Sequence, residues 1–131
     1  MIGLDTNVLI RHVTQDDRVQ SPRASALIES RLTEEEPGFI SVVTLAETAW
    51  VLRRVYKYHP AEIAAAIERL LQIGTLIVEN EVEVFFAMTA LKHGRADFTD
   101  ALIAALGTRA GCSTTMTFDR KAARLPGFSL A

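Results

Sequence analysis

The sequence predicts an α/β fold, with helices on both faces of a central parallel sheet of four or five strands. Short strand-like apolar runs alternate along the chain with longer runs whose apolar residues recur at helical spacing. Such alternation is typical of parallel sheets in three-layer α/β/α domains. The length of 131 residues fits one domain, residues 1–131, and suffices to bury a core.

The expected strands are short and the expected helices are marked by their end signals. The strands are Ile2–Leu4, Phe39–Ile40, Leu76–Val78, Thr114–Phe118 and, as a fifth, Phe128–Leu130. The helices run from Ser21-Pro22 to about Thr33, from Ser41 to Tyr56, from Pro60 to Gly74, from Asn80 to Gly94, and through Ala101–Leu106 to Gly111. We expect Ser21 to be an N-cap with Pro22 at the first helical position. The helix from Ser41 to Tyr56 is apolar on most faces, which predicts that it is buried.

Composition excludes several classes of protein. Nearly half of the residues are hydrophobic, so the chain is not expected to be disordered. No apolar run approaches the ~20 residues that cross a membrane, and no signal peptide is expected. The single cysteine, Cys112, indicates a buried structural thiol in a reducing compartment, so we expect a cytoplasmic protein. A net charge of −2 argues against binding nucleic acid through bulk charge, but leaves room for a local basic rim.

Five acids are the candidate catalytic and metal-binding residues. Asp5 ends the first expected strand and Asp119 follows the fourth, which is where sites form in parallel sheets. Each acid also has a structural alternative. Asp5 could cap a helix, Glu47 could complete a capping box with Thr44, Asp97 and Asp100 could cap the last helix, and Asp119 could start a turn.

Taken together, these acids indicate a metal site. Carboxylates on buried helices are costly unless they are paired or bind a metal. Several carboxylates at one edge of a sheet would repel each other, and a hard cation such as Mg²⁺ or Mn²⁺ removes that repulsion. One or two such ions would activate water and stabilise a phosphoryl transition state. The set of ligands comprises Asp5, Glu47, Asp97, Asp100 and Asp119.

Four motifs, in order along the chain, resemble those of PIN domains. Asp5-Thr6-Asn7 resembles the opening motif, and Thr44-Leu45-Ala46-Glu47 resembles the motif of the second acid. The segment from Ala96 to Ala105, with Asp97 and Asp100, resembles the third. Thr117-Phe118-Asp119-Arg120-Lys121, followed by Leu125-Pro126-Gly127-Phe128, resembles the fourth motif and the closing strand.

A PIN domain this short most resembles the VapC-type toxins of toxin–antitoxin pairs. The resemblance implies an Mg²⁺-dependent endoribonuclease, a homodimer and a small antitoxin that blocks the site. Carried over by position, Asp5, Glu47, Asp100 and Asp119 form the acidic tetrad and Asp97 supports it. Thr6, Asn7 and Thr117 match polar positions that hold the acids or water.

Basic residues beside the acids are candidate RNA contacts, although each is equally explained as solvated surface. They are Arg11, Lys92, Arg95, Arg120 and Lys121. Two other functions remain open. An aspartyl-phosphate phosphohydrolase would need a second Asp two residues after Asp5, where Asn7 stands. A catalytically silent PIN scaffold would be expected to lack an acid, and none is missing.

Overall fold

The computed structural model describes residues 1–131, and its strands form two separate parallel sheets. In the first sheet β1 (Ile2–Gly3), β2 (Gly38–Ile40) and β3 (Leu76–Val78) lie in that order. Ile2 stands opposite Gly38, and Phe39 stands opposite Ile77. The second sheet pairs β4 (Thr115–Thr117) with β5 (Phe128–Leu130).

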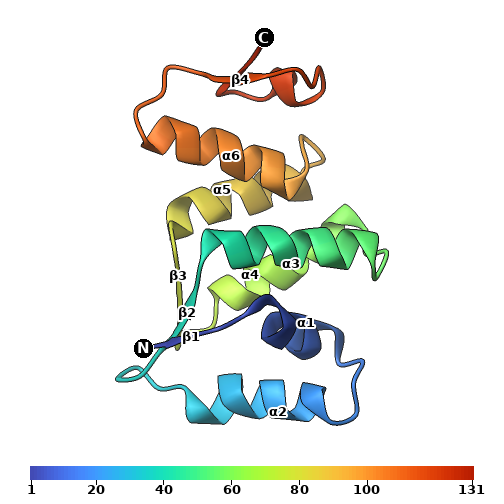
Figure 1. Ribbon diagram of the computed structural model, residues 1–131, viewed down its shortest axis with the longest axis vertical. Helices are drawn as coiled ribbons and strands as arrows, with labels where there is room; N and C mark the ends of the chain where they lie inside the picture. The colour runs from blue at the N-terminus through green and yellow to red at the C-terminus, as the bar shows by residue number, and fades with distance from the viewer.

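Helices make up most of the remaining chain and stack between α2 and the C-terminal strands (Figure 1). α3 lies between α1 and α6 and packs on both, while α5 packs on α4 and α6. None of the helices combines the length and apolarity required to span a bilayer. The helices are α1 (Thr6–Thr14), α2 (Gln20–Ala26), the π-helical turn η1 (Leu27–Arg31), α3 (Val42–Arg54), α4 (Pro60–Leu71), α5 (Glu81–Lys92), α6 (Phe98–Arg109) and the 3₁₀ turn η2 (Ala122–Arg124).

The α/β class and the parallel pairing are confirmed, but the single sheet of four or five strands is wrong. β4 lies against α6 instead of pairing with the first sheet. A Cβ atom on Gly107 of α6 would come within 2.5 Å of Thr115 Oγ1, so the glycine permits this close approach. Strands of only two or three residues offer few ladder hydrogen bonds, and packing on α6 therefore decides where β4 lies.

One continuous apolar core joins the first sheet to the helices. Leu9 of α1, Ile40 of β2, Leu45 and Leu52 of α3, and Val84 of α5 are completely buried in it. Full burial of each such side chain contributes about 1.5–3 kcal/mol relative to exposure. This core fixes α1, α3 and α5 relative to the ends of the strands, and those ends carry the candidate site.

Three local expectations from the sequence are wrong. α2 begins at Gln20, because the carboxylate of Asp17 accepts hydrogen bonds from the backbone N–H groups of Gln20 (2.7 Å) and Val19 (2.9 Å). Ser21 is therefore buried within the first turn and is not the N-cap. Cys112 is exposed. α3 is buried along one face only, and its opposite face is exposed.

A polar network ties α1 to the end of α3. The Arg11 guanidinium donates to Asp16 Oδ1 at 3.1 Å and to the Tyr56 hydroxyl at 3.2 Å. Tyr56 in turn donates to Asp16 Oδ2 at 2.6 Å, and Thr14 Oγ1 donates to Asp16 Oδ1 at 2.7 Å. Hydrogen bonds from Tyr56, then from Thr14, and the nearby Arg11 charge lower the pKa of Asp16 to about 2.

Tyr56→Phe should raise the pKa of Asp16 toward its ordinary value of 3.8, because the strongest hydrogen bond to the carboxylate is lost. A pKa depressed by folding contributes stability above the unfolded value. That stability is lost as the pH falls from the pKa of Asp16 in the unfolded chain to its pKa in the folded protein, here between about 4 and 2. The measurement is an NMR titration of the Asp16 carboxyl carbon together with acid unfolding. The variant should lose less stability than the wild type across this window.

Tyr58→Phe is the matched control for this experiment. Tyr58 packs edge-on against Tyr56, with ring centroids 6.3 Å apart, and its hydroxyl makes no hydrogen bond in the protein. Its removal should leave the pKa of Asp16 unchanged. An unchanged pKa in Tyr56→Phe as well would show that the hydroxyl does not hold the carboxylate.

Candidate functional site

Asp5 stands at the carboxyl end of β1, immediately before α1. Its carboxylate is exposed, and Oδ1 accepts a hydrogen bond from the backbone N–H of Thr6 at 2.7 Å. Thr6 is buried and Asn7 is exposed. The carboxylate is thus held at the edge of the sheet, while its second oxygen remains free to bind a ligand.

Glu47 lies on the exposed face of α3. Val43, Glu47 and Trp50 follow each other at helical spacing along this face, and all three are exposed. The expectation of a buried, costly Glu47 carboxylate is therefore wrong. The capping alternative is not realised either, because Ser41 caps α3 by accepting from the backbone N–H of Thr44 at 3.1 Å. No hydrogen bond or ion pair within the protein occupies the Glu47 carboxylate.

Glu79 is an acid near the site that the sequence analysis missed. It follows β3 directly, and its Oε1 accepts a hydrogen bond from the backbone N–H of Val42 at 3.0 Å. This contact joins the end of β3 to the start of α3, the helix that carries Glu47. The rule that singled out Asp5, an acid at the carboxyl end of a parallel strand, applies equally to Glu79.

Asp97 and Asp100 stand at the start of α6 and have different roles in the structure. Asp97 is the N-cap, with Oδ1 accepting from the backbone N–H of Asp100 at 2.7 Å. Asp97 therefore caps the helix, which was the structural alternative to a catalytic role. Asp100 is half-buried in the first turn, and its carboxylate caps nothing.

Asp119 reaches the start of α6 because β4 runs back along that helix. β4 begins beside Gly107, near the end of α6, and continues toward the helix start. Thr117 Oγ1 accepts a hydrogen bond from the backbone N–H of Asp119 at 3.0 Å. Asp119 Oδ1 accepts from the N–H groups of Lys121 (2.8 Å) and Ala122 (3.2 Å). Both the backbone and the carboxylate of Asp119 are therefore held in place.

The charges of two other acids, Asp97 and Asp119, act on Asp100. Burial raises the pKa of Asp100, and the negative charges of Asp97 and Asp119 raise it further, while Lys121 opposes the shift. A carboxylate whose pKa is raised by its neighbours is in a site that favours a positive charge. The three acids come from two segments that are about twenty residues apart in the chain, the start of α6 and the loop after β4.

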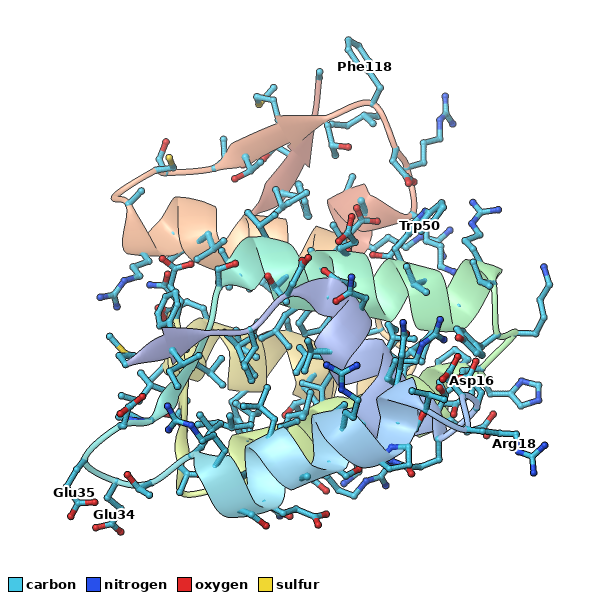
Figure 2. The ribbon with its side chains drawn as sticks, turned by 60° about the horizontal axis from the view of Figure 1, so that its bottom comes forward. Asp16, Arg18, Glu34, Glu35, Trp50 and Phe118 are labelled. Atoms are coloured by element: carbon cyan, nitrogen blue, oxygen red, sulfur yellow. The ribbon has the colours of Figure 1, made fainter.

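The structure does not bring all five acids into one tight cluster. No three Asp, Glu, His or Cys side chains are close enough, as they stand, to hold a metal ion. Glu34 and Glu35 project into solvent from the loop before β2 (Figure 2), at the start of that strand, whereas Asp5 and Asp119 follow the carboxyl ends of β1 and β4.

The candidate RNA contacts fall into two groups. Arg11 is engaged by Asp16, Tyr56 and Gln20, so its guanidinium is already bound inside the protein. Lys92 is exposed, and its Nζ lies 3.8 Å from Glu68 Oε2. Arg95, Arg120 and Lys121 are exposed and form no ion pair. Of these, Arg120 and Lys121 directly follow Asp119 and are the cations best placed beside the acids.

The parallel strands, with carboxylates at their ends and at the start of α6, define an α/β domain with an acidic edge. The chain belongs to the PIN domain family, whose model matches residues 2–127. PIN domains are generally nucleases that use divalent metal ions. No curated protein matches the chain closely enough to be reported as a relative.

The donor atoms of the site fit such an ion. All candidate ligands are carboxylate oxygens, which hard divalent cations prefer. Burial is the main cause of the raised pKa of Asp100, and the negative charges of Asp97 and Asp119 add to it; a bound cation would offset these effects. Asp5, Glu47, Asp100 and Asp119 each keep at least one carboxylate oxygen that forms no hydrogen bond with the protein.

Proposed function

We propose that this protein is an Mg²⁺-dependent endoribonuclease that cleaves RNA phosphodiester bonds with metal-activated water. The observation that carries the proposal is the half-buried Asp100 carboxylate beside Asp97 and Asp119, in a chain of the PIN domain family. Mn²⁺ would serve in place of Mg²⁺, and one or two ions would bind.

Each residue has a definite part in this proposal. Asp5, Glu47, Asp100 and Asp119 would bind the cation, with Asp97 supporting them from the N-cap of α6. When bound, the cation would lower the pKa of a water molecule and stabilise negative charge on the phosphoryl group. Thr117 would keep Asp119 in position through its backbone N–H. Arg120 and Lys121 would attract the RNA backbone.

The direct test is cleavage of a mixed pool of RNA by the purified protein, in Mg²⁺, in Mn²⁺ and in EDTA. Internal cuts that require a divalent ion are the expected result, read by sequencing the new ends. No internal cut with either ion would contradict the proposal and favour a catalytically silent scaffold. Release of phosphate from small phosphate esters, without RNA cleavage, would favour a phosphohydrolase.

We also propose that the protein is the toxin of a type II toxin–antitoxin pair that acts in the cytoplasm. Its supports are the likeness of a PIN domain this short to VapC-type toxins and the exposed carboxylates, which would bind an antitoxin tail bearing Arg or Lys. Expression of the protein should arrest growth, and co-expression of a short neighbouring reading frame should relieve the arrest. Persistent arrest with that frame would remove the antitoxin from the proposal.

A C₂ homodimer is the proposed assembly. Val82, Phe85 and Phe86 of α5 are exposed and offer apolar surface to a second copy. Light scattering at micromolar concentration should give the mass of two chains, and the mass of one chain would contradict the dimer.

A further inference from the structure

Phe118 is the most exposed of the large apolar side chains, with 88% of its surface accessible. It follows β4 and precedes Asp119, and its ring projects from the C-terminal segment into solvent (Figure 2). The backbone beside it is held by the Thr117–Asp119 hydrogen bond and by the two N–H groups that bind Asp119. A ring that is held in place and has no partner in the protein is available to a ligand.

Three basic residues follow Phe118 and Asp119 in the chain. Arg120, Lys121 and Arg124 follow Phe118 within six residues, and all are exposed. The four ion pairs of the chain involve other basic residues, namely Arg11, Arg31, Lys92 and Arg109. Exposed basic residues that follow an exposed aromatic ring in the chain complement a nucleotide, since they can bind phosphate while the ring stacks on a base.

We propose that Phe118 is a base-stacking residue that holds a nucleobase of the RNA and thereby positions the neighbouring phosphate beside Asp119. The inference rests on the proposed ribonuclease function and adds to it a residue that positions the substrate. Asp119 is the next residue, so a base stacked on Phe118 would place its own phosphodiester within one nucleotide of the acids. Met116 of β4, two residues earlier in the chain, is also exposed and adds apolar surface to this segment.

The experiment compares three substitutions of Phe118. Phe118→Trp keeps a flat aromatic face, Phe118→Leu keeps only apolar bulk, and Phe118→Ala removes both. Binding is measured in EDTA by anisotropy of a labelled, unstructured 12-nucleotide RNA, and cleavage is measured in Mg²⁺ on the same strand. We expect Leu and Ala to weaken binding and raise KM by ~10-fold or more, with kcat less affected and Trp close to the wild type.

A second arm uses an RNA of the same sequence with abasic positions. The wild type should bind this strand about as weakly as Phe118→Ala binds the intact strand. Phe118→Ala should not distinguish the two strands, because the stacking partner is missing in both cases. Val19→Ala, an exposed apolar residue just before α2 at the opposite end of the molecule, should behave as the wild type throughout (Figure 1).

Two results would overturn the inference while the proposed function stands. One is cleavage by Phe118→Ala with an unchanged KM. The other is Phe118→Leu behaving as the wild type, which would indicate a surface that docks a protein through apolar bulk. A wild type that neither binds nor cleaves RNA would overturn the proposed function as well. Because Phe118 is exposed, all three variants should keep the wild-type melting temperature, and a melt of each checks this.

Discussion

Asp5→Asn should abolish RNA cleavage while leaving the fold intact. The carboxylate is exposed, and its one contact within the protein is the hydrogen bond from the Thr6 N–H. The side-chain oxygen of asparagine accepts the same hydrogen bond, so only the negative charge is lost. Replacing even an outer-shell partner of a metal costs about 10–100-fold, and we therefore expect loss of a ligand to lower the rate by more than about 100-fold.

The cleavage assay in Mg²⁺ measures the loss of activity, and a thermal melt shows whether the fold is intact. Glu34→Gln is the matched control, because it removes the same charge from an exposed carboxylate remote from the site (Figure 2). It should cleave RNA at the wild-type rate. If a folded Asp5→Asn protein also cleaves at that rate, Asp5 is not a metal ligand.

Asp100→Asn should make the stability of the folded protein less dependent on Mg²⁺. The pKa of Asp100 is raised by burial and by Asp97 and Asp119, so folding disfavours its charged form relative to the unfolded chain. An acid whose pKa is raised by folding contributes stability at low pH and loses that contribution as the pH rises. The favourable position of Asp100 in the first turn of α6 is therefore outweighed. In EDTA, the variant should be as stable as the wild type or more stable.

The wild type should gain stability when Mg²⁺ binds the folded protein only. For a dissociation constant near 1 mM, about 10 mM Mg²⁺ contributes roughly 1.4 kcal/mol. In a domain of this size that raises the melting temperature by about 3–6 °C. Asp100→Asn removes one ligand and should therefore reduce this rise in melting temperature. Thermal melts of the wild type and of Asp100→Asn, each in EDTA and in Mg²⁺, give the four melting temperatures to be compared.

Asp97 provides the contrast on the same helix. Asp97→Ala removes the N-cap of α6 and should lower stability by about 1 kcal/mol, with or without metal. Asp97→Asn keeps a capping oxygen and should recover most of that loss. If Asp100→Asn behaves like Asp97→Ala, less stable in EDTA with an undiminished Mg²⁺ increment, then Asp100 has a structural role and binds no metal.

Sequence by itself determined the class of fold and the family of this protein. The alternation of apolar runs predicted parallel strands among helices, because strand and helix periodicities are properties of a few consecutive residues. The capping signal at Asp97 was reliable, because its partner lies only three residues away in the chain. The four acidic motifs, in order along the chain, indicated the PIN family that the match over residues 2–127 confirms.

Only the tertiary structure decided which of these local features meet. β4 packs on α6 through the close approach at Gly107, which divides the strands into two sheets and brings Asp119 to Asp100. Arg11 donates a hydrogen bond to Tyr56, which lies forty-five positions later in the chain. The residues next to Arg11 in the sequence therefore do not reveal this contact. Glu47 and Phe118 are exposed because the core is filled by other faces of their elements. Exposure and proximity depend on packing between distant segments, and no pattern within a few residues contains that information.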